Sequence, residues 1–149
     1  MNIFILDQNP IRAAQFHADK HVNKMILESA QMLSTVLGGR YKPTHANHPC
    51  TLWTGRSRAN ASWLIELTYA LNQEAQRRYG HDRDHKSLAV IDELVNSCAI
   101  NALPDEGLTP FAQAMPDEYR QPNAVNAYRA YYRSKPFVSW DKGTAPDWW

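Results

Sequence analysis

The sequence lacks the features of a membrane or exported protein. No hydrophobic run approaches the roughly 18 apolar residues of a membrane span, and the opening segment MNIFILD is short and has no basic stretch of the signal-peptide kind. Two cysteines, Cys50 and Cys98, form neither a metal-binding nor a disulfide pattern. No repeat, low-complexity tract or linker divides the chain. We therefore expect one globular domain over residues 1–149, in the cytoplasm and without a membrane partner.

A strong excess of charge of one sign is also missing, since 16 Lys and Arg stand against 15 Asp and Glu. A net charge of +1 argues against a protein that wraps long stretches of phosphate backbone. Residues 1–60 nevertheless carry seven basic and three acidic side chains, and four of the six histidines. This asymmetry fits a local basic surface and fits chance equally well.

Hydrophobic spacing predicts a mainly α fold. Asn9-Pro10 supplies a helix start and Gly38-Gly39 a helix end, which predicts one long helix over residues 10–37. A polar loop over 40–49 precedes a helix over 57–79, at its widest 49–79, and a third helix covers about 86–100. Residues 101–122 are expected to be mostly loop, and a short helix over 123–133 leads into an aromatic tail. The expected architecture is a single-domain compact helical bundle with a short extended N-terminal segment and an irregular C-terminal part.

Four polar side chains follow one another at helical spacing in the first predicted helix. His17, His21, Lys24 and Glu28 are separated by 4, 3 and 4 positions, so at about 100° per residue they form one line beside the apolar stripe. Such a boundary can face a groove in which partly desolvated groups acquire shifted pKa values. The structural alternative is a surface pair between Lys24 and Glu28, with both histidines in solvent.

The polar loop adds His45, Asn47 and His48. Together with His17 and His21, the two loop histidines offer four imidazoles for a metal ion, but there is no HExxH motif and no cysteine ligand. His48-Pro49 is equally suited to starting a helix. We expect no metal and no cofactor, and keep a histidine metal hydrolase as an alternative.

Two clusters combine aromatic and basic side chains. Trp53, Arg56 and Arg58 suit base stacking with phosphate contact, or alternatively an ordinary helix end with a core indole. Tyr128, Tyr131 and Tyr132 lie among Arg129 and Arg133 in the last predicted helix. Trp148-Trp149 is expected to pack on the body of the protein. The predicted substrate-binding residues are His17, Lys24, Asn47, His48, Trp53, Arg56, Arg58, Tyr128, Tyr132 and Arg133.

Several of these segments resemble one family in the same order. Ala18-Asp19-Lys20-His21 with Glu28 seven residues on resembles the first helix of pyrimidine-dimer DNA glycosylases of the phage endonuclease V type. The Asn47-His48-Pro49 segment, Arg77-Arg78-Tyr79-Gly80 at the end of the second helix, and Tyr128–Arg133 (YRAYYR) are similar too.

The resemblance implies that the N-terminal α-amine attacks the sugar carbon to form an imine, after which β-elimination can cut the strand. An α-amine has an ordinary pKa of about 7.7–8.0, so a useful fraction is neutral near physiological pH. Carried over, the implied catalytic groups are the amine of Met1, the carboxylate of Glu28 and, for substrate orientation, His21.

Two positions differ from the family pattern. The best-known members expose a threonine amine after methionine removal, whereas Asn2 is too large for ordinary removal, which leaves Met1 as the amine. The arginines that flank the helix glutamate are replaced here by Leu27 and Gln31, and Lys24, Arg56 and Arg58 are the cations that remain.

The expected function is that of an enzyme, a DNA glycosylase with or without lyase activity, which acts on a damaged or modified pyrimidine extruded from DNA. Its expected partner is DNA, bound through few phosphate contacts. The alternatives are a non-catalytic nucleic-acid-binding or phage–host interaction module, and the metal hydrolase named above.

Overall fold

Helices make up all the regular structure of the computed structural model, which describes residues 1–149. The α-helices are α1 (Pro10–Phe16), α2 (Asp19–Leu37), α3 (Pro49–Thr54), α4 (Arg58–Tyr79), α5 (Leu88–Asn96) and α6 (Ala124–Arg133). Two 3₁₀-helices, η1 (Ala99–Ala102) and η2 (Asp117–Tyr119), lie in the region between α5 and α6. The predicted mainly α class is confirmed.

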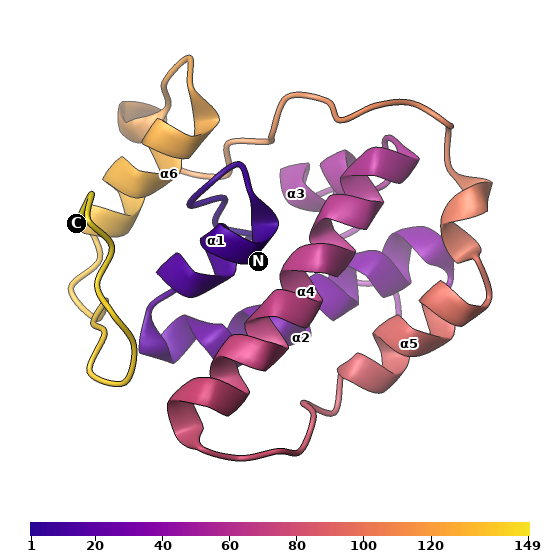
Figure 1. The fold of residues 1–149 in the computed structure, drawn as a ribbon. Coiled ribbons are helices and arrows are strands. Elements are labelled where there is room, and N and C mark those ends of the chain that lie inside the picture. The colour runs from indigo at the N-terminus through magenta and orange to yellow at the C-terminus, as the bar shows by residue number, and fades with distance from the viewer.

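The long helices α2 and α4 form the centre of the fold and cross each other (Figure 1). α1 packs on α4, and α5 lies beside α2 and α4 at the far end from α6 (Figure 1). One core of 28 buried side chains draws residues from all six α-helices. None of the helices is long and apolar enough to cross a membrane.

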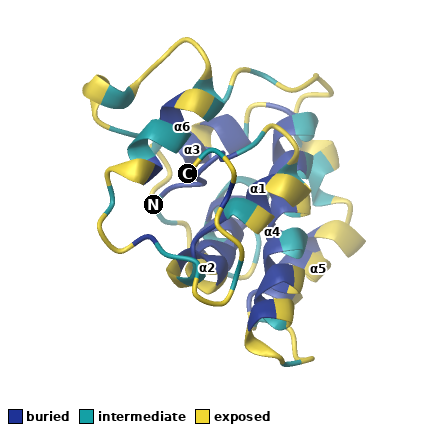
Figure 2. Ribbon diagram, turned by 60° about the vertical axis from the view of Figure 1, so that its left-hand side comes forward, coloured by how far each residue is buried: buried dark blue, intermediate teal, exposed yellow.

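The N-terminal segment runs through this core without forming a strand. Ile3, Ile5 and Leu6 are almost completely buried, and Phe4 adopts a left-handed backbone conformation with φ of 57°. The chain start lies between α6 and α2 (Figure 2). Burial of the segment that follows it fixes the position of the terminal amine inside the molecule.

The predicted helix over residues 10–37 is wrong in one respect: it is two helices. α1 ends at Phe16, and both His17 and Ala18 have extended backbone, with ψ of 137° and 157°. No proline or glycine marks this break. The N–H groups that open α2 are satisfied by distant partners instead, Ala18 N by the hydroxyl of Tyr132 and Asp19 N by the carbonyl of Ser139.

The remaining elements follow the sequence closely. Ser57 caps the N-terminus of α4 through its side chain, and Gly38 and Gly80 end α2 and α4 in the left-handed region that glycine adopts without strain. Residues 49–54 form a separate short helix, and the third predicted helix ends earlier, at Asn96, before η1. The predicted last helix over 123–133 is confirmed within one residue.

Candidate active site

The terminal amine and a buried carboxylate meet where the N-terminal segment crosses α2. The α-amine nitrogen of Met1 lies 3.2 Å from Oε1 of Glu28, which points from the middle of α2. The backbone N–H of Asn2 donates to the same oxygen, also over 3.2 Å. Glu28 is only 9% exposed. The carboxylate is therefore held by the chain start rather than by Lys24, and the surface pair between Lys24 and Glu28 does not form.

Asn2 fixes the geometry of the chain start. Its side-chain oxygen accepts the backbone N–H groups of Ile3 and Phe4, over 2.8 and 3.1 Å, and its amide nitrogen donates to the carbonyl of Ala114 over 2.8 Å. These bonds tie the first residues both to their own turn and to the loop before α6. Asn2 was not among the predicted site residues, because an asparagine in an extended segment carries no local signal of such a role.

A hollow of about 480 Å³ opens beside the amine. Residues from the chain start, from the start of α3, from the loop before α6 and from α6 line it together: Met1, Asn2, His48, Pro49, Ala112, Gln113, Ala114, Met115, Arg120 and Tyr131. A protein hollow that places an amine, an imidazole and a guanidinium around one space is suited to an anionic or polar ligand.

His48 faces the hollow as the N-cap of α3. Its Nδ1 accepts the N–H of Cys50 over 3.0 Å, so in the neutral ring the proton resides on Nε2. Partial burial lowers the pKa of His48, and the positive charge of the terminal amine lowers it further. Met1 and His48 thus line one hollow beside Glu28, and the ring has one N–H available to a ligand.

His21, the third residue of the implied catalytic set, lies away from the hollow lining. Its ring stacks on Phe4 with 4.7 Å between centroids, and its Nδ1 lies 2.8 Å from the hydroxyl of Tyr132, which already accepts the N–H of Ala18. The hydroxyl proton of Tyr132 is free to be donated to the ring of His21. Desolvation by burial, followed by the charges of His17, Lys24 and Lys135, lowers the pKa of His21 to about 3.

His17 does not continue the line of His21, Lys24 and Glu28, because it caps the end of α1 rather than belonging to α2. Its Nδ1 lies 2.7 Å from the carbonyl oxygen of Ala13, and the side chain is fully buried, with no partner for Nε2. Desolvation lowers its pKa to about 4. A neutral, enclosed imidazole at this junction has no access to a substrate in this structure.

Three predicted stacking residues are core side chains. Trp53 is 3% exposed and packs edge-on against Trp63, while its indole N–H donates to the carbonyl of Thr109. Tyr128 and Tyr132 are fully buried, and the hydroxyl of Tyr128 donates to the carbonyl of Ala112. None of the three presents a ring face to a ligand, as the structural alternative for Trp53 anticipated.

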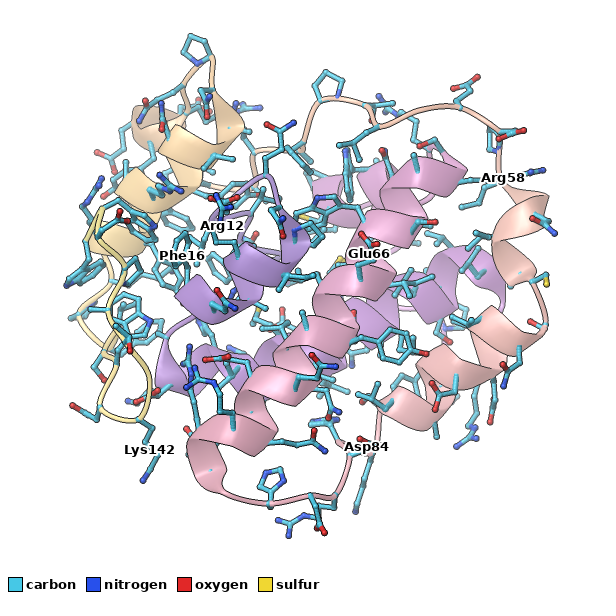
Figure 3. The ribbon with its side chains drawn as sticks, in the orientation of Figure 1. Arg12, Phe16, Arg58, Glu66, Asp84 and Lys142 are labelled. Carbon is cyan, nitrogen blue, oxygen red and sulfur yellow. The ribbon has the colours of Figure 1, made fainter.

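The predicted cations are spread over the surface. Arg58 binds the carbonyls of Asn101 and Leu103 and pairs with Asp105, and it stands at the edge of the molecule beside η1 (Figure 3). The guanidinium of Arg133 lies over the indole of Trp148 and donates to its carbonyl. Both therefore hold the fold together.

The other predicted polar contacts are exposed. Lys24, Asn47 and Arg56 all have exposed side chains, and no ion pair forms at Lys24 or Arg56. His45 is exposed as well and contacts the hydroxyl of Thr44. No group of three or more His, Cys, Asp or Glu side chains comes close enough together to hold a metal ion.

Several residues of the hollow lie where the sequence offered no signal. Gln113 and Arg120 come from the stretch 101–122, which has no periodicity from which a side-chain direction can be read. Gln113 is engaged on both sides by Gln121, whereas Arg120 reaches only the exposed Asp117, over 3.3 Å. Tyr131 belongs to the aromatic cluster of the YRAYYR segment, but the predicted substrate-binding residues of that segment were Tyr128, Tyr132 and Arg133.

A comparison with known proteins identifies the family of the chain. The family described as pyrimidine dimer DNA glycosylase matches residues 1–87, which contain the amine, Glu28 and His48. No curated protein and no solved structure matches the chain. Because the matched region covers more than half of the 149 residues, the chain belongs to the pyrimidine dimer DNA glycosylase family.

Proposed function

We propose that this protein is a DNA glycosylase with lyase activity that uses the α-amine of Met1 as its nucleophile. Its substrate is a damaged or modified pyrimidine nucleotide extruded from DNA into the hollow. The contact of 3.2 Å between the amine and Glu28, inside a family of DNA glycosylases, is the observation that supports this most strongly.

The chemistry assigns one role to each group. The neutral amine attacks C1′ of the sugar, and the glycosidic C–N bond breaks with its electron pair leaving on the base. Glu28 takes a proton from the resulting secondary ammonium and returns it to the ring oxygen O4′ as the sugar opens to an iminium. The carboxylate of Glu28, ionised again, then takes a proton from C2′, which expels the 3′ phosphate, and water hydrolyses the imine to release the amine of Met1.

His48 is the hydrogen-bond donor to the departing base in this proposal. Its Nδ1 is occupied by the backbone N–H of Cys50, which directs Nε2–H toward other partners. The lowered pKa keeps the ring neutral near pH 7, so Nε2–H donates a hydrogen bond rather than a proton. This bond orients a pyrimidine oxygen and stabilises the negative charge of the departing base, which takes its proton from water. Arg120, whose only ion-pair partner is exposed, is a phosphate contact at the mouth.

Borohydride trapping on DNA tests the nucleophile. With a duplex that carries an aldehydic abasic site, we expect a covalent adduct that maps by peptide mass spectrometry to the N-terminal peptide. A chain with two residues added before Met1 moves the amine away from Glu28 and should form at least about 100-fold less adduct, since even a small misplacement of the nucleophile removes the oriented attack. An adduct on a lysine side chain would overturn the assignment.

Substitutions at Glu28 and His48 test the roles of these two residues separately. Glu28→Gln should reduce borohydride-trapped adduct and strand cleavage about 100-fold or more, because both need the sugar ring to open. Glu66→Gln, which changes an exposed glutamate on α4 (Figure 3), should leave both unchanged. His48→Gln should slow release of the base but allow trapping on a preformed abasic site. Normal turnover by the Glu28 variant, with unchanged helix content, would reject the proposal.

A further inference from the structure

Three lysines gather on the face that holds the mouth of the hollow. The ammonium of Lys135 lies over the ring of Tyr131, 4.2 Å from its centroid, and Tyr131 itself lines the hollow. The same ammonium is 5.6 Å from the centroid of Phe137, and the ammonium of Lys20 is 6.0 Å from that centroid. We call Lys20, Lys24 and Lys135 the lysine rim.

Lys24 belongs to the same group by its position on α2. It stands one helical turn after Lys20 and one turn before Glu28, and both Lys24 and Lys135 act on the imidazole of His21. Phe4 and Tyr131, stacked with 6.2 Å between centroids, form the floor between Lys135 and the chain start. The rim therefore continues from the hollow along the start of α2.

No acidic side chain neutralises the rim. Ion pairs in the protein involve arginines and the terminal amine, and none involves a lysine. Like charges one turn apart on a helix are mutually destabilising, and Lys135 adds a third charge from another element. Aromatic rings hold two of the three ammonium groups in place, which orders the charges before any ligand arrives.

We propose that the lysine rim binds consecutive phosphates of the DNA strand adjacent to the nucleotide in the hollow. The inference rests on the proposed function, because it takes DNA as the ligand of the neighbouring site. An ordered row of unpaired ammonium groups suits point contacts with phosphates, and the small net charge of the whole protein makes a local row of this kind the main electrostatic contact.

The dependence of binding on salt concentration tests the rim separately from catalysis. The ligand is a duplex with a tetrahydrofuran abasic analogue, which cannot form an imine. Each phosphate contact contributes about 0.9 to the slope of log K against log salt. We expect Lys20→Gln, Lys24→Gln and Lys135→Gln each to reduce the slope by about this amount, and the triple variant by about three times as much.

Matched variants control for folding and for general charge. Lys86→Gln removes an exposed lysine that lies two residues before the start of α5 and over none of the aromatic rings of the rim, and should leave the slope unchanged. Lys135→Arg keeps the charge and should restore it. Equal slopes in the rim variants and the native protein would overturn the rim, even if borohydride trapping succeeds. Reduced slopes without any trapping would retain the rim and reject the amine chemistry.

Discussion

At the scale of single residues, Asn2 is a buried polar side chain whose hydrogen bonds hold the chain start in place. Its side chain is 7% exposed, and its oxygen and nitrogen both bind backbone groups, which a buried polar side chain needs in order to be stable. The backbone N–H of Asn2 is a second donor to the carboxylate of Glu28, beside the terminal amine. The position of the reactive amine therefore depends on the residue that follows it.

Asn2→Asp tests this dependence. Aspartate keeps the acceptor for Ile3 and Phe4 but loses the donor to the carbonyl of Ala114 and adds a negative charge near Glu28. We expect the free energy of unfolding in urea to fall by about 1–3 kcal/mol and adduct formation to slow. The exposed Asn47→Asp is the matched control, and equal losses in both variants would contradict the assigned role.

At the scale of elements, the break between α1 and α2 is a feature that local sequence does not predict. Helical periodicity continues through His17 and Ala18, so local reasoning has no ground for a break there. The break is stabilised by Tyr132, Ser139 and Arg78, each at least 59 residues from its partner. By contrast, α4 and α6 have side-chain caps at Ser57 and Asn123, and their predicted bounds hold within one residue.

The residues of the candidate site differ in the same way: those fixed by local sequence are predictable, and those fixed by distant contacts are not. The contact between Met1 and Glu28 was predicted from a resemblance in the first helix, where the motif itself is local. The burial of Tyr128 and Tyr132 was not predicted, and a core position for Trp53 was only the alternative, because the same aromatic spacing serves a core and a stacking surface. Arg120 was missed because its direction depends on a loop fixed by tertiary contacts.

The α1–α2 junction also predicts sensitivity to acid. Burial lowers the pKa of His17 to about 4 and that of His21 to about 3, from 6.5 when unfolded. The unfolded chain therefore binds protons that the folded chain does not, so the stabilisation is complete above pH 6.5 and is lost as pH falls through and below that value. Each histidine contributes up to about 1.4 kcal/mol per pH unit within this window.

Urea unfolding between about pH 8 and about pH 5 measures this slope. His21→Gln should reduce the slope below pH 6.5 by about half, even though the variant is less stable at every pH. His45→Gln, which removes an exposed histidine, should leave the slope unchanged. A native slope near zero between pH 6.5 and pH 5 would show that the two rings are not held neutral.

At the scale of the whole molecule, the C-terminal tail fastens the last helix to the first. The indole of Trp148 contacts the guanidinium groups of Arg129 and Arg133, which lie 5.1 and 5.5 Å from the ring centroid, and meets Phe16 edge-on. Arg129 also donates to the carbonyl of Leu6. The tail thereby supports both α6, which carries Tyr131, and the segment behind the reactive amine.

The two terminal tryptophans should differ in their effect on stability but not on chemistry. Trp148→Ala removes a half-buried ring with cationic and aromatic partners, and should lower the free energy of unfolding by about 2–3 kcal/mol. Trp149 is 46% exposed, so Trp149→Ala should lower it by only about 1 kcal/mol. Neither ring lines the hollow, so adduct formation by folded protein at about 25 °C should match the native rate. If the Trp148 variant were fully folded yet slow in trapping, the tail would act on the position of the amine as well as on stability. Residues from both ends of the chain would then contribute to the site.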